Sequence, residues 1–312
     1  MGGLVAAPVH GARPPALRLL TIIERAGQPL YRAFSRDLSA ALTHRGIANV
    51  RILDWEPGQL PNRQMAHRLD RSAFIVTVGP RSLAWRLAQN LVTPTLATYV
   101  TREDFHRLTG SPHRFVTAIY LNQPFERFLA LARILIPRLH AISAVLSLDQ
   151  KWRRPLIERV AHAHGYAAHI VVTPVDPRAI FSAFRFALPG TDALIELPDT
   201  TVYNPFTLPE IFLRAFRYGV PMIGYAPESV HDGALAGLYS TPSQFSRQAL
   251  PIVLSAVAGG RVQLPAPAYP RLFKVLLNRT VAGTLGIPLP DLPRVLMEMH
   301  RRHPPRPAEF GT

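Results

Sequence analysis

The sequence predicts an α/β protein made of two units in tandem, each built on a parallel sheet. Three observations predict this class. Short apolar runs alternate with segments of helical spacing along most of the chain, which is typical of strand–helix–strand units. The alternation starts again after about residue 124, and 312 residues exceed one core of roughly 100–200 residues. Hydrophobic residues make up 48% of the chain and charged residues 18%, so a folded protein is expected.

The first unit begins with a strand at Leu17–Ile23, which is apolar on both faces, as strands of a parallel sheet are. A helix is predicted from Pro29 to Arg45, because its apolar residues recur at helical spacing and Gly46 provides an end. The same reasoning predicts strands at Val50–Leu53, Phe74–Gly79, Pro94–Ala97 and Phe115–Leu121, and helices at Gln64–Asp70 and Ser82–Gln89.

The second unit repeats the pattern, and glycines at Gly165 and Gly219 end two of its helices. Helices are predicted at Pro124–Leu135, Pro155–His164, Pro177–Phe186 and Leu208–Tyr218, and strands at Ala141–Leu146, His169–Val172, Ala193–Leu197 and Met222–Tyr225. A glycine–alanine turn, a helix and an asparagine-led helix ending in Leu-Gly-Ile-Pro follow. The order therefore indicates two similar sheets in tandem.

The net charge is +15, and all but Lys151 and Lys274 of the 35 basic residues are arginines. Nucleic-acid binding is one interpretation of this charge. The arginines are scattered singly and in pairs, however, and no DNA-binding motif accompanies them, so they indicate only nonspecific attraction. We therefore expect no nucleic-acid partner.

The chain contains no cysteine, which excludes disulfides, thiolate metal sites and a cysteine nucleophile. Apolar runs are too short to span a bilayer, which takes roughly 20 residues. The N-terminal MGGLVAAPVHGARPP is either a truncated export signal or a disordered leader. The C-terminal proline- and arginine-rich segment is expected to be disordered.

Motifs of common enzymes are missing from the sequence. It has no G-x-S-x-G elbow, no phosphate-binding G-x-x-x-x-G-K-[ST] loop, no G-x-G-x-x-G fingerprint and no H-E-x-x-H. His162, His164 and His169 offer imidazole ligands, but His162 and His164 point about 200° apart on a helix. We therefore predict a protein that is not an enzyme and that needs no metal and no cofactor. A two-lobe glycosyltransferase is the enzyme alternative.

Six segments, in this order, carry a resemblance to a known family: QPLYRAF, VTVGPRSL, ILIPRLHAISAVL, ALIELPDTTV, DGALAGLYSTPSQFSRQA and LNRTVAGTLGIPLP. From Leu17 to Pro290 the chain resembles the substrate-binding proteins of ABC transporters with the type I periplasmic-binding fold. The branch it resembles includes aromatic amino-acid binders. The resemblance implies two Rossmann-like lobes with parallel sheets, joined by three crossover strands, with the ligand in the cleft between them.

Carried over to this chain, the resemblance places residues 17–119 and 235–262 in the first lobe. Residues 120–234 and 263–301 form the second lobe, residues 1–16 are the leader and residues 302–312 the tail. A crossover near Gly233 is then expected to act as a hinge, because glycine accommodates the dihedral changes of closure.

Ligand contacts are expected at the carboxyl ends of strands, where open α/β sheets bind ligands. In the first lobe these positions are Gln28, Thr77, Gly79, Arg81, Thr98 and Tyr99. Gly79 allows a close backbone approach, and the helix that follows it suits a carboxylate. The alternative is that Gly79 and Pro80 only form a strand-to-helix turn.

In the second lobe Asp199 is the residue best placed to pair with a ligand ammonium group, as the family's acidic residue at this point does. Helix capping or a loop salt bridge is the alternative role. Thr200 follows it, Gln123 lies at the first crossover, and Tyr225 ends a strand where an aromatic ring would stack on a flat ligand. A tyrosine packed in the core is the alternative for Tyr225.

The sequence thus predicts a periplasmic solute-binding protein, with its export signal absent or truncated. Its partners would be a small molecule and an ABC permease or other membrane partner. The ligand is expected to be amino-acid-like or a small carboxylate or aromatic compound, and the protein a monomer. A ligand-sensing or scaffold subunit for a membrane receptor or kinase is the alternative, because both roles use the same cleft.

Overall fold

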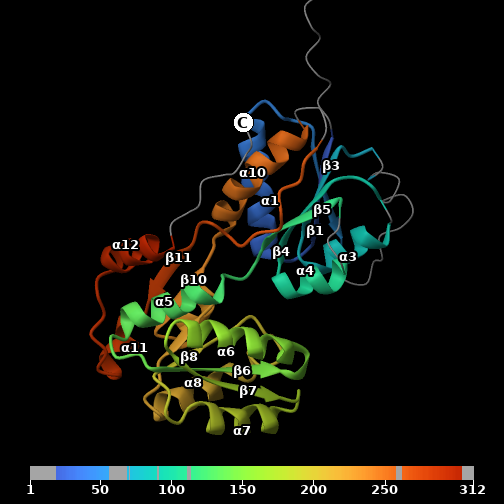
Figure 1. The fold of residues 1–312 in the computed structure, drawn as a ribbon. Helices are drawn as coiled ribbons and strands as arrows, with labels where there is room; N and C mark the ends of the chain where they lie inside the picture. Colours follow the sequence, from blue (N-terminus) through green and yellow to red (C-terminus); the bar gives the residue numbers. More distant parts are fainter. Residues whose placement is uncertain are drawn as a thin grey trace, which may run out of the picture.

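The computed structural model describes residues 19–55, 69, 71–89, 91–110, 114–257 and 262–303. In this part of the chain two sheets form two lobes, and helices cover both faces of each sheet (Figure 1). The predicted leader, residues 64–68 and 70 of the helix expected at Gln64–Asp70, and residues 304–312 of the predicted tail lie outside the described residues. Arg302, the first residue assigned to the tail, belongs to helix α12 (Leu292–Arg302). The two-lobe α/β class is confirmed.

The first lobe holds a five-stranded sheet in the order β2-β1-β3-β4-β5, with every neighbouring pair parallel. Its strands are β1 (Leu20–Arg25), β2 (Val50–Trp55), β3 (Phe74–Val78), β4 (Thr95–Val100) and β5 (Val116–Tyr120). Strand β4 extends past the predicted end at Ala97, because Thr98 and Val100 pair with β5. The carboxyl ends of all five strands therefore meet at one edge.

Helices α1 (Pro29–Thr43) and α10 (Pro242–Val257) pack together on one face of this sheet. Helices α3 (Pro80–Ala88) and α4 (Arg102–Thr109) lie on the other face (Figure 1). No element was predicted for the segment of α4. It carries one buried apolar side chain, Phe105, and its helix is started by Thr101, whose hydroxyl accepts a hydrogen bond from the Asp104 N–H at 3.0 Å.

The second lobe holds a six-stranded sheet in the order β11-β10-β9-β8-β6-β7. Its strands are β6 (Ala141–Ser147), β7 (Ala167–Thr173), β8 (Ala193–Ile195), β9 (Met222–Gly224), β10 (Ala236–Tyr239) and β11 (Lys274–Leu277). All neighbouring pairs are parallel except β10 and β11, which are antiparallel.

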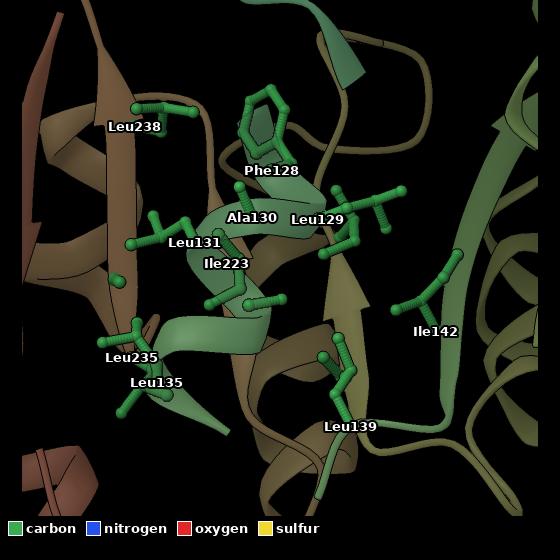
Figure 2. Close-up of a cluster of buried hydrophobic side chains, with 14 of the residues drawn as sticks. Phe128, Leu129, Ala130, Leu131, Leu135, Leu139, Ile142, Ile223, Leu235 and Leu238 are labelled. Atoms are coloured by element: carbon green, nitrogen blue, oxygen red, sulfur yellow. The ribbon is translucent and has the colours of Figure 1, made fainter. Parts of the chain in front are cut away.

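Two helical layers enclose this sheet. One contains α5 (Phe125–Leu135), α6 (Arg154–Ala163) and α12 (Leu292–Arg302), and the other α7 (Pro177–Ala187), α8 (Leu208–Arg217) and α9 (Pro227–Asp232). A 3-10 turn, η1 (Leu148–Arg153), precedes α6, and α11 (Arg279–Thr284) follows β11. Figure 2 shows side chains of α5, including Phe128, Leu131 and Leu135, packed against Ile223, Leu235 and Leu238.

The chain passes between the lobes three times: after β5, after β10, and between Ala268 and β11. The second and third passages differ from the expected ones. Strand β10 pairs with β9, so the return to the first lobe follows Tyr239 instead of Leu235, and Gly233 lies inside the second lobe. Ala268 still bonds to β5, with Tyr120 N donating to Ala268 O at 2.9 Å, so the last passage comes after residue 262.

Candidate functional site

A pocket of about 190 Å³ lies where the lobes meet beside the crossovers. Residues of the first lobe, of the crossovers and of the second lobe all line it. They are Arg102, Glu103, Asn122, Gln123, Phe125, Glu126, Phe128, Arg153, Leu156, Ile157, Val160, Leu197, Pro198 and Tyr269. Because both lobes contribute walls, the contacts that a molecule makes in this pocket depend on the distance between the lobes.

The first-lobe wall is the start of α4. Its first backbone N–H, that of Arg102, donates to Asn122 Oδ1 at 3.0 Å. Asn122 lies in the first crossover and is buried. This hydrogen bond holds the start of α4 against the first crossover. The first-lobe wall of the pocket is therefore bonded to the chain that connects the lobes.

An ion pair joins the two lobes at the wall of this inter-lobe pocket. Arg153 Nε of the second lobe lies 3.7 Å from Glu103 Oε1 of the first, and these side chains are only 9% and 10% exposed. The distance exceeds that of a hydrogen bond. The other carboxylate oxygen, Glu103 Oε2, is buried without a hydrogen-bond partner. The pair is therefore buried, and Glu103 Oε2 can still accept a hydrogen bond.

The three crossovers are joined to one another by hydrogen bonds. Gln123 Nε2 of the first crossover donates to Ser240 Oγ of the second at 2.7 Å, and that hydroxyl donates to Leu272 O of the third at 2.6 Å. Arg127 donates to Gln123 Oε1 and to Pro270 O, both at 2.6 Å. We call these five residues the crossover network. They connect all three chain segments that pass between the lobes.

Arg127 is the charged member of the crossover network. Its guanidinium lies 5.0 Å from the centre of the Phe273 ring, and the side chain is buried. Burial lowers the pKa of Arg127 to about 10, because the charged form loses its water. The cation is thus held by carbonyl groups and a ring, with no carboxylate bonded to it among the described residues.

A larger cavity, of about 730 Å³, adjoins the inter-lobe pocket on the first-lobe side. The two share Arg102, Glu126 and Tyr269 as walls. The rings of Tyr120 and Tyr269 lie edge to face at 5.3 Å. Burial raises the pKa of both tyrosines, while a hydrogen bond from Arg102 opposes that shift. Arg102 and these hydroxyls provide a polar wall between the two spaces.

Four of the predicted first-lobe residues do come together at the carboxyl edge of β3 and β4. Thr98 Oγ1 donates to Thr77 O at 3.1 Å, and Gly79 N donates to Thr98 O at 2.9 Å. Gly79 has φ +89°, and a Cβ there would lie 2.7 Å from the Tyr31 hydroxyl oxygen. Tyr99 packs in an aromatic cluster with Tyr31. These four residues are buried and contact one another or their neighbours in the lobe.

Tyr99 has its hydroxyl buried without a hydrogen-bond partner and a backbone φ of 55°. Burial raises the pKa of this phenol, so it stays protonated. Gln28 and Arg81, the two other first-lobe predictions, are exposed at the starts of α1 and α3. None of the first-lobe predictions lines the inter-lobe pocket.

In the second lobe Asp199 is buried, and both its oxygens accept backbone hydrogen bonds. Oδ2 accepts from Ser147 N at 2.8 Å and Oδ1 from Thr201 N at 3.1 Å. These bonds join the Asp199 loop to the end of β6, which is neither the helix cap nor the loop salt bridge considered above. Thr200 beside it is exposed, and its carbonyl accepts from Asn204.

Tyr225 is half-buried against the core, and burial raises its pKa to about 12. Gln123, the remaining prediction, lines the pocket and belongs to the crossover network. Its amide is therefore already bonded on both sides. The structure thus brings one of the ten predicted residues into the inter-lobe pocket.

Glu196 is a buried acid that the sequence reasoning missed. It follows β8, is 1% exposed, and its Oε2 has no hydrogen-bond partner. Burial raises the pKa of Glu196 to about 7, and hydrogen bonds from Ser229 and the Tyr225 backbone oppose the shift. The sequence feature that could have revealed it is a glutamate directly after the apolar run ALI.

Among the described residues no group of three histidine or acidic side chains lies close enough to hold a metal ion. In the same part of the chain, no helix has the length and apolar character needed to cross a membrane.

No protein-family model matches the sequence, and no curated protein matches it. Solved structures do match over most of their length. The ligand-free, open structure of CD0873, a substrate-binding protein with adhesive properties from Clostridium difficile, has a TM-score of 0.74 at 16% identity, covering 88% of this chain and 97% of that one.

An ABC domain in complex with L-Trp from Streptococcus pneumonia has a TM-score of 0.65 at 17% identity, covering 91% of this chain and 98% of the other. A conserved domain protein from Vibrio cholerae has the same score at 19% identity, with 91% and 98% covered. At these identities the likeness concerns the fold. Two α/β lobes, three passages between them and these neighbours together identify the architecture of this chain as the type I periplasmic-binding fold.

Proposed function

We propose that this protein is an extracytoplasmic solute-binding protein, located in the periplasm, that captures a small molecule between its lobes and delivers it to an ABC permease. The observation that carries the proposal is the inter-lobe pocket, which has walls from both lobes and is lined by the first crossover, whose Gln123 is bonded to the second. A pocket placed there couples occupancy to the relative position of the lobes.

The mechanism follows from differential affinity. A ligand that contacts both lobes binds the closed arrangement better than the open one, so it shifts the population toward closure. The second passage between β10 and α10 contains only Ser240 and Thr241, and the crossover network fixes it to the other two passages. Short, mutually bonded connections favour rotation of whole lobes about this region.

Two structural neighbours support this function. One is a substrate-binding protein and another holds L-Trp. For this chain we propose a small, amino-acid-like or aromatic ligand without a net charge. The exposed residues Gln28, Arg81 and Thr200 lie at carboxyl edges of the two sheets, where they would contact the parts of a ligand that extend beyond the pocket.

A third cavity, of about 330 Å³, is a weaker candidate for the solute site. It is lined by apolar residues of the second lobe alone, including Phe212, Phe216 and Leu285. A ligand there would not bridge the lobes. Occupancy of this cavity would therefore leave lobe closure unchanged, which distinguishes it from the inter-lobe pocket.

A thermal-shift screen of the purified protein against amino acids, small carboxylates, purines, sugars and oxyanions tests the proposal. A ligand at 100 times its Kd stabilises the folded state by about 2.7 kcal/mol, which raises the melting temperature by several degrees. Small-angle X-ray scattering with each hit should show a smaller radius of gyration. Hits that leave the radius unchanged would contradict closure around the ligand.

A further inference from the structure

We propose that Glu103 and Arg153 fasten the two lobes around the ligand, and that the ligand donates a hydrogen bond to Glu103 Oε2 from an uncharged amide N–H or hydroxyl. This inference rests on the proposed function and specifies the chemistry of the same pocket. Neither residue was among the ligand contacts expected from the sequence.

The positions of the two residues make them a contact between lobes. Glu103 is in the first turn of α4 in the first lobe, and Arg153 ends η1 in the second. With 10% and 9% of their side chains exposed, both are shielded from water in this arrangement of the lobes. Opening the cleft separates them, because α4 and η1 belong to different lobes.

The carboxylate of Glu103 lacks a hydrogen-bond donor. Its Oε1 lies 3.7 Å from Arg153 Nε, beyond hydrogen-bond length, and its Oε2 is buried with no partner. A buried carboxylate oxygen without a donor is costly, and the side chain lines the pocket. A ligand N–H or O–H in the pocket supplies the missing bond and lowers the energy of the closed form.

The charge of the pocket favours an uncharged ligand. Four charged side chains line it, and the arginines Arg102 and Arg153 balance the glutamates Glu103 and Glu126. A ligand with a net charge would lose its hydration without gaining an unbalanced counter-charge. A neutral group that donates to Glu103 avoids that loss.

The size and walls of the pocket favour a ligand of about one ring. Its volume of about 190 Å³ is somewhat larger than an engineered cavity of roughly 150 Å³ that binds benzene. Phe125, Phe128 and Leu156 add apolar walls to the charged ones. Four probes with the same ring therefore separate the effects of donor and charge: benzamide, phenol, benzoate and benzylammonium.

Calorimetric titration of the full chain with these probes tests the ligand chemistry. We expect benzamide and phenol to bind, and benzoate and benzylammonium to bind at least about tenfold more weakly. Glu103→Gln should weaken the affinity for benzamide about tenfold. If the new amide turns its oxygen toward the ligand, its NH2 group faces the guanidinium of Arg153; if it turns the other way, its NH2 group faces the donor of the ligand. Glu158→Gln is the matched control, since Glu158 pairs with Arg154 within α6.

A distance measurement tests the fastening role independently of any ligand. The chain has no cysteine, so spin labels can be placed on Arg36→Cys of α1 and Arg185→Cys of α7, both exposed and on different lobes. Glu103→Gln and Arg153→Met should each broaden the distance distribution toward longer values. The double variant should broaden it no further than either single variant, and Arg154→Met should leave it unchanged.

Three results would overturn the inference: benzoate bound as tightly as benzamide, benzamide affinity unaffected by Glu103→Gln, or distances unaffected in both pair variants. If none of the four probes binds but another solute draws the lobes together, the inference fails and the proposed function stands. If no solute binds and the labels never approach each other, the proposed function fails as well.

Discussion

The crossover network makes a quantitative prediction about Arg127. Replacing Arg127 with Met removes two hydrogen bonds from a charged donor, to Gln123 Oε1 and Pro270 O, at 2.6 Å each. Bonds of this kind contribute about 1.5–3 kcal/mol each, so about 3–6 kcal/mol is lost. The drop of the pKa from 12.5 to about 10 means that burying the cation costs about 3 kcal/mol, which the substitution recovers.

The expected net loss is therefore at most about 3 kcal/mol, and a double-mutant cycle with Gln123→Leu gives a sharper number. In the cycle the burial cost and the bond to Pro270 cancel, which leaves the single bond between Arg127 and Gln123. We expect a coupling energy of about 1.5–3 kcal/mol.

Urea unfolding of the four proteins at pH 7 measures this coupling. Arg133→Met, an exposed position on the same helix, is the control and should change the free energy of unfolding by less than about 0.5 kcal/mol. Additivity of the two substitutions within about 0.5 kcal/mol would refute the bond between Arg127 and Gln123 as part of the crossover network.

Three further predictions concern residues at the carboxyl edges of the sheets. Because the pKa of Glu196 is raised from 4.5 to about 7, the folded protein keeps a proton that the unfolded chain loses, so stability falls by about 3 kcal/mol as pH rises from about 4.5 to 7. Glu196→Gln should abolish that fall, and urea titrations at pH 5 and pH 8 with unchanged pH dependence would contradict it. Gly79→Ala should cost about 1–3 kcal/mol because of its positive φ and the contact with Tyr31, whereas Gly283→Ala, in open space, should be neutral or stabilising in thermal melts. Asp199→Ala should cost about 1–3 kcal/mol without any ligand, because two backbone N–H groups lose their acceptor.

The elements of the fold were predictable where apolar periodicity is strong. Strands such as β3 (Phe74–Val78) are buried throughout, and helices such as α1 (Pro29–Thr43) carry an apolar stripe, so their patterns are clear in the sequence. Helix α4 (Arg102–Thr109) was missed because Phe105 is its only buried residue. The Thr101 and Asp104 capping pair was the local signal that could have revealed it.

The lobe boundary after α9 was placed too early for a different reason. The segment Ala236–Tyr239 is an apolar strand that suits either sheet, and its pairing with β9 and β11 depends on residues far away in the chain. Pairing partners of a short buried strand are not encoded in its own periodicity. The glycine at Gly233 was therefore assigned to a hinge although it precedes a strand of the second lobe.

The pocket residues were harder to predict than the sheet edges. Glu103 and Arg153 are 50 residues apart, and only the arrangement of the lobes brings them to 3.7 Å. The bonds among Gln123, Ser240 and Leu272 are equally long-range. Rules for the carboxyl ends of strands identify Leu197 and Pro198 after β8, but the other walls of the pocket come from helices and from crossovers.

Hydrogen–deuterium exchange with and without a solute from the thermal-shift screen tests the central claim most directly. If the solute binds between the lobes, exchange should slow in the first turn of α4 and in α6 together, because these elements form opposite walls of the pocket. Protection confined to one lobe, with the other unchanged, would contradict the account of a solute held between two lobes.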